Sequence, residues 1–157
     1  MDTKLRQSLK TFLEGEGSLT EGVQTSIAES GIGDVDVFNF DHQGVTFKCT
    51  QVVAPQLAVN KIEASFRFPT HKKQDRAQLH SVVNTFNRSR VAMKAVLEGL
   101  EKSHFDISFS VEFMCPDQNI VNDMIHPAVK VLRNCGRLLL SSLRSHGVSL
   151  KEPSKND

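Results

Sequence analysis

The chain contains six histidines, and they are the first residues to test for chemistry because imidazole can bind metals and move protons near neutral pH. They are scattered, and none belongs to an HExxH motif or to a pair of histidines with metal-ligand spacing. We therefore expect surface or boundary positions for all six, and we predict no metal site, no cofactor and no catalytic residues. The six are His42, His71, His80, His104, His126 and His146.

Asp34 and Asp36 are the nearest thing to a carboxylate pair. Two positions apart on a strand, they would project to one face, where paired carboxylates can bind a metal or share a proton. Their position at a strand start favours solvated turn carboxylates instead. Gly31-Ile32-Gly33 lacks the rest of a phosphate-binding glycine motif, and the chain contains no GxSxG nucleophile setting.

Asn84 and Asn87 lie three residues apart in a predicted helix, although asparagine is a poor helix former. Their side chains could bond to the loop that leads into Val91. They could equally be ordinary helix-end residues that cushion the turn to the next strand. We keep both as candidate loop-bracing or partner-binding positions.

Composition describes an ordinary globular chain. Its 157 residues suit one domain, the net charge is +1, and 39% of the residues are hydrophobic. Ten Phe without Trp or Tyr indicate core aromatics rather than a stacking or recognition surface. The charge balance argues against nucleic acid and membrane partners. Three widely spaced cysteines without a CxxC motif, and no leader or long apolar run, predict a cytoplasmic protein.

The elements that must position these residues follow from periodicity. Alternating apolar residues predict strands over 34–40, 44–50, 60–68, 91–97 and 105–113, the last with Phe105, Phe109 and Phe113 inward. Helices are predicted over 3–14, 74–89 and 117–146, with a short additional one over 18–30. Ser18 and Glu21 have the spacing of a capping box for that short helix. Pro127 should either kink the last helix or begin it.

These elements predict one α+β domain over residues 1–147 and a flexible tail over 148–157. We expect two layers, with helices on one face of a mainly antiparallel five-stranded sheet, in the order α(α)-β-β-β-α-β-β-α. The stripe Leu79, Val82, Val83 and Phe86 of the middle helix should pack on the apolar face of the following hairpin.

The order of elements, together with Phe68-Pro69 at a strand end and the spaced Asn84 and Asn87, resembles the YbjN-like family. Members are described as candidate bacterial sensory-transduction regulators whose fold is shared with type III secretion chaperones. The resemblance covers roughly residues 34–146. It implies a non-enzymatic binding or regulatory domain that is often dimeric, with no catalytic residues to carry over.

We therefore predict a chaperone-like or regulatory protein-interaction module that acts as a homodimer or binds another protein. The last helix carries apolar residues beyond one stripe, which we expect to seek a partner. The alternative is a small-ligand sensor or enzyme with a pocket between sheet and helices, lined by His80 or Asn84. The surplus apolar residues are Val129, Val131, Leu140 and Leu143.

Overall fold

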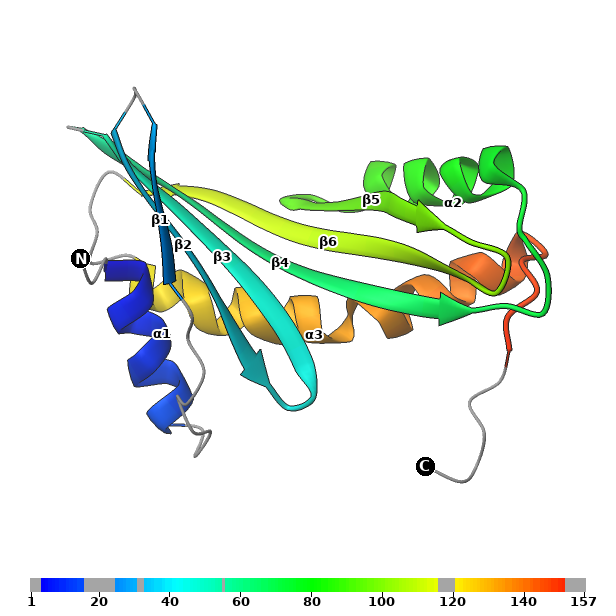
Figure 1. The fold of residues 1–157 in the computed structure, drawn as a ribbon, viewed down its shortest axis with the longest axis horizontal. Coiled ribbons are helices and arrows are strands. Elements are labelled where there is room, and N and C mark those ends of the chain that lie inside the picture. The colour runs from blue at the N-terminus through cyan, green and yellow to red at the C-terminus, as the bar shows by residue number, and fades with distance from the viewer. Residues whose placement is uncertain (1–3, 16–24, 31–32, 55, 116–120, 152–157) are drawn as a thin grey trace. The chain divides into compact units, whose positions relative to one another are not determined.

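The computed structural model describes residues 4–15, 25–30, 33–54, 56–115 and 121–151. Over these residues the chain is an α+β protein whose helices and strands follow the predicted order, with one additional strand after the first helix (Figure 1). The elements are α1 (Lys4–Gly15), β1 (Thr25–Ser30), β2 (Gly33–His42), β3 (Val45–Ala54), β4 (Leu57–Pro69), α2 (Arg76–Arg88), β5 (Met93–Leu100), β6 (His104–Cys115) and α3 (Val121–Ser145). The predicted class is confirmed.

The sheet has six strands in the order β1-β2-β3-β4-β6-β5, one more than the sequence predicts. The additional strand is β1, so the predicted helix over 18–30 is wrong for residues 25–30, and its first part lies outside the described residues. β1 pairs with β2 in antiparallel register from Thr25 opposite Phe38 to Ser30 opposite Gly33. Backbone pairing with a formed strand has overridden the local capping pattern.

The chain forms two compact units. Unit 1 comprises Met1–Ala64 and Ser110–Arg133, and unit 2 comprises Ser65–Phe109 and Asn134–Asp157. The elements β4, β6 and α3 contribute residues to both units. Each unit therefore has its own packing, described separately below.

In unit 1, α1 buries Leu5, Leu9 and Leu13, which recur every four residues and so lie on one side of the helix. The β2–β3 hairpin turns at Gln43 and Gly44, whose φ angles of 50° and 77° are those of a two-residue turn that matches the strand twist. Beside this turn, Phe40 and Phe47 stack with ring centroids 4.9 Å apart.

Unit 2 is built around Phe109, which is fully buried. Its ring makes edge contacts with Phe66 of β4 at 5.7 Å and with Phe86 of α2 at 5.5 Å. The predicted α2 stripe is buried as expected, and α2 begins after Asp75, whose carboxylate accepts a hydrogen bond from the Ala77 N–H. The predicted packing of this helix on the hairpin face is therefore confirmed.

The second half of α3 packs on the same aromatic layer of unit 2. Gly136 permits this, because a Cβ atom there would lie 2.9 Å from the Phe66 ring. The helix begins at Val121, six residues before Pro127, so Pro127 lies inside α3 and does not begin it. Of the predicted tail, Leu150 bridges to Thr70 and the Lys151 N–H donates to the Pro69 carbonyl.

Candidate functional site

The two candidate asparagines of α2 have different surroundings. Asn84 is exposed, whereas Asn87 is half-buried and uses its side-chain amide on the backbone of Ala95 in β5. The Asn87 Nδ2 donates to the Ala95 carbonyl at 3.0 Å, and the Ala95 N–H donates to Asn87 Oδ1 at 2.7 Å. The amide thus contacts a strand rather than the loop before Val91, and it pairs with that strand as a neighbouring peptide would.

β5 is a terminal strand of the sheet, so its outer edge presents backbone groups that could pair with another chain. The Ala95 backbone points away from β6 toward Asn87, whereas the Glu101 N–H points to the His104 carbonyl. The Asn87 amide therefore covers the outer edge of β5 at Ala95.

Replacing Asn87 by alanine is expected to lower the free energy of unfolding by about 1–2 kcal/mol, because two hydrogen bonds to a backbone edge are lost. Urea unfolding followed by circular dichroism measures this. Asn84→Ala is the matched control, three residues earlier on the same helix, and should stay within about 0.5 kcal/mol of the parent. Equal effects of the two substitutions would contradict the bridging role of Asn87.

The candidate partner-binding residues of α3 also differ from one another. Val131, in unit 1, is 42% exposed. In unit 2, Leu140 is half-buried and Leu143 is fully buried. Val129 is 1% exposed as well, so Val129 and Leu143 are core residues and not part of an apolar surplus.

The histidines are correctly predicted to be surface or boundary residues except for His42, which is 2% exposed. In unit 1 the ring of Phe12 contacts His42 at 5.4 Å and His126 at 5.0 Å between centroids. In unit 2, His80 is exposed, as is Asn84. Neither side chain lies in the buried core of unit 2, and the alternative ligand site stays a prediction.

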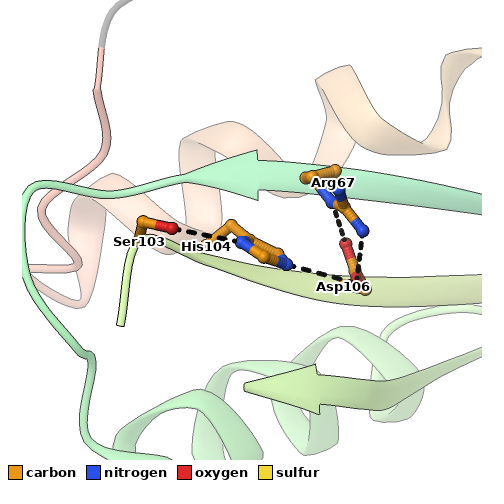
Figure 2. Close-up of polar contacts among 4 residues, drawn as sticks. All are labelled: Arg67, Ser103, His104 and Asp106. Carbon is orange, nitrogen blue, oxygen red and sulfur yellow. Dashed lines mark hydrogen bonds and ion pairs between the residues drawn. The ribbon is translucent and has the colours of Figure 1, made fainter. Parts of the chain in front are cut away.

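A polar cluster lies on the outward face of β4 and β6 in unit 2. Figure 2 shows Arg67 and Asp106 facing each other across the two strands, with His104 and Ser103 beside them. Arg67 Nε and Nη2 donate to the two Asp106 carboxylate oxygens at 2.9 and 3.2 Å. His104 Nε2 lies 3.8 Å from Asp106 Oδ2, and its Nδ1 lies 3.3 Å from the Ser103 hydroxyl.

This cluster has the residue types of a Ser-His-Asp triad but not its geometry. Asp106 is engaged by Arg67, and hydrogen bonding to Asp106 raises the pKa of Arg67. The 3.8 Å separation of His104 and Asp106 exceeds hydrogen-bond length, so the carboxylate does not orient the imidazole as a general base. The arrangement is a cross-strand ion pair with an adjacent histidine.

A second polar cluster is buried in unit 1. Arg6 of α1 and Asp36 of β2 are 5% and 4% exposed, and Arg6 Nε donates to Asp36 Oδ2 at 3.2 Å while its Nη2 donates to Oδ1. The Arg6 guanidinium carbon lies 4.7 Å from the centre of the Phe38 ring. Asp36 is therefore a buried ion-pair partner and not the solvated turn carboxylate that the sequence predicts. The side chain of Asp34 lies outside the described residues.

The buried polar residues continue along neighbouring strands. Asp36 is opposite Gln51 of β3, and Gln51 is opposite Asn60 of β4, with both amides fully buried. Gln51 Nε2 donates to Asn60 Oδ1 at 2.5 Å. Gln51 Oε1 has no hydrogen-bond partner among the residues that the structure describes. We call Arg6, Asp36, Gln51 and Asn60 the polar row.

All three cysteines are buried thiols. Burial is the main cause that raises the pKa of Cys135 to about 12, and it also raises the pKa of Cys49. The Cys135 Sγ lies 3.0 Å from Met93 Sδ in unit 2. Both thiols are thus protonated packing residues at neutral pH.

Within the described part of the chain, no group of three histidine, cysteine or acidic side chains could hold a metal ion. No helix in that part is long and apolar enough to cross a membrane. These findings concern only the described residues.

No family model matches this chain, and no curated protein matches it. The chain is similar to the crystal structure of YbjN from E. coli, described as a candidate transcription regulator. The two are 13% identical with a TM-score of 0.46, over 93% of this chain and 95% of that one. This neighbour bears the name of the family that the sequence resembles.

Proposed function

We propose that this chain is a non-enzymatic protein-interaction module, regulatory or chaperone-like, that acts as a homodimer. The observation that carries the proposal is the exposure of apolar side chains on α3 in unit 1. Met124 and Val131 are 36% and 42% exposed and lie seven residues apart. Two turns of helix separate them, so they lie on the same side of α3.

Their neighbours in sequence explain why this side of the helix suits a partner. Ile125 and Leu132, one residue later in each case, are buried and face the core of unit 1. Met124 and Val131 therefore extend the apolar side of α3 beyond what unit 1 covers. A seven-residue apolar repeat is the pattern by which helices pack against one another.

The small net charge of the chain favours a second copy of itself as the partner. The net charge is +1, so two copies repel each other little. Identical subunits also pair most often about a two-fold axis, where one patch contacts itself. Helix pairing through the Met124 and Val131 side of α3 satisfies both conditions.

The outward cluster of unit 2 supports the non-enzymatic part of the proposal. Its two-fold hydrogen-bonded contact is the Arg67–Asp106 pair, and the 3.8 Å between His104 Nε2 and Asp106 Oδ2 does not align His104 and Ser103 for nucleophilic catalysis. The Arg67–Asp106 pair joins β4 to β6, and no reaction is assigned to it.

Light scattering coupled to size exclusion tests the dimer. Val131→Glu is expected to shift the chain toward the monomer, with the dimer dissociation constant raised at least tenfold, because a charge would enter an apolar contact. Ser141→Glu adds the same charge at another exposed position of α3 and should leave the mass unchanged. If Val131→Glu and Ser141→Glu gave the same molecular mass, Val131 would not lie in the dimer interface.

A further inference from the structure

We propose that Asp36, Phe38 and Gln51 form a recognition site for an arginine side chain carried by an amphipathic helix of a partner protein. In the isolated chain Arg6 of α1 occupies this site. α1 is thus an internal ligand, and a partner helix of the same chemistry can replace it.

The contacts of Arg6 are those by which proteins select arginine. The carboxylate of Asp36 receives two parallel N–H bonds, from Nε and Nη2. The Phe38 ring lies 4.7 Å from the guanidinium carbon, on the same strand two residues along. A planar fork that pairs with a carboxylate and lies over an aromatic ring fits guanidinium and not the ammonium of lysine.

The site contains an acceptor that Arg6 leaves unused. Gln51 lies directly opposite Asp36 on β3 and is fully buried, and its Oε1 has no partner among the described residues. Opposite residues of an antiparallel pair have Cβ atoms about 5 Å apart, so one guanidinium can reach both side chains. An arginine that donates hydrogen bonds to both Asp36 and Gln51 would pair the Gln51 Oε1 acceptor that Arg6 leaves unused.

α1 is suited to being replaced. It has 12 residues, fewer than an isolated helix needs to be stable in water, so its order depends on packing. Leu5, Leu9 and Leu13 supply that packing, and Arg6 adds a buried ion pair. A buried ion pair adds little net stability compared with an apolar replacement, and the two parallel hydrogen bonds of this pair select a guanidinium.

The inference rests on the proposed function in one respect, since the ligand is a segment of protein. It does not depend on the homodimer, which would form through α3. The molecular mass of the wild-type chain in solution tests the dimer, whereas the binding of a peptide tests the arginine site. One proposal can therefore fail while the other holds.

The test uses the full chain and a fluorescently labelled peptide of residues 1–15. In the Arg6→Ala variant the internal ligand lacks its guanidinium, so the peptide is expected to bind at least tenfold more tightly than to wild type. The same peptide with Arg6→Lys should bind at least tenfold more weakly, because an ammonium cannot pair with two oxygens in parallel. Fluorescence anisotropy measures all three affinities.

Two further variants keep the outcome decisive. Arg6→Ala with Asp36→Asn removes the unpaired buried charge, so it should be at least as stable as Arg6→Ala yet lose the peptide. If Arg6→Ala fails to fold, Arg6→Lys replaces it as the receiving chain. The inference would be overturned if the peptides with arginine and with lysine at position 6 bound equally well. Peptide binding to the chain that carries Asp36→Asn would also overturn it, and so would the absence of peptide binding to both Arg6→Ala and Arg6→Lys chains.

Discussion

Replacing Phe109 by alanine is expected to lower the free energy of unfolding by about 3–5 kcal/mol. Phe109 is fully buried and makes edge contacts with the rings of Phe66 and Phe86. Truncation removes the transfer free energy of the ring and leaves a cavity between β4, β6 and α2 in unit 2. Rigid aromatic neighbours cannot collapse into that space, so the upper part of the range is expected.

Denaturant unfolding measured by circular dichroism checks this value. Phe109→Leu keeps much of the volume and should cost less than half as much. Val91→Ser is the control within unit 2, because Val91 is 95% exposed, and its effect should stay within about 0.5 kcal/mol. A cost below about 1 kcal/mol for Phe109→Ala would contradict the packing described for unit 2.

The second large effect concerns the buried ion pair of unit 1. Asp36→Ala leaves Arg6 buried without its carboxylate, and the expected loss of unfolding free energy is about 3–5 kcal/mol. Arg6→Ala should lower the free energy of unfolding by a similar amount, because it leaves the Asp36 carboxylate buried without its guanidinium. The exchange of both residues for apolar ones, Arg6→Met with Asp36→Leu, should recover most of the loss because neither charge remains buried.

The double-mutant cycle is therefore strongly non-additive in this account. The free energies of unfolding of the wild type, Arg6→Met, Asp36→Leu and the Arg6→Met, Asp36→Leu double variant, from denaturant unfolding, supply the measurement. Single substitutions that each cost less than about 1 kcal/mol would show that the pair is solvated and not buried.

The sequence predicted the fold where one period dominates a stretch. In β6 the alternation correctly predicted that Phe105, Phe109 and Phe113 are buried. It did not predict that Ser108 and Ser110 on the other face of the strand are buried as well. In α2 the stripe of Leu79, Val82, Val83 and Phe86 is equally regular and is buried. These two elements are also where the hairpin and helix pack in unit 2.

The prediction from sequence failed where local patterns competed with strand pairing between distant segments. Residues 25–30 were predicted to be helical from a capping pattern at Ser18 and Glu21, but they pair with β2. Val91 was predicted to begin a strand. It is 95% exposed, because β5 begins at Met93 after Ala92, whose φ of 63° turns the chain.

The polar row was missed for a different reason. Asp36, Gln51 and Asn60 have the same parity as buried Phe38, Cys49 and Ile62, so alternation places them inside. Residue type suggested the surface, and sequence alone does not show that Arg6 lies against Asp36. Extending each alternation through its polar members would have identified three of the four residues.

Sedimentation equilibrium of the wild-type chain, over a series from about one to one hundred micromolar, tests the proposed function most directly. Because one chain has a mass of 17.5 kDa, the homodimer predicts twice that mass at the upper concentrations, with Val131→Glu closer to the monomer. A mass of 17.5 kDa throughout the series would contradict the homodimer.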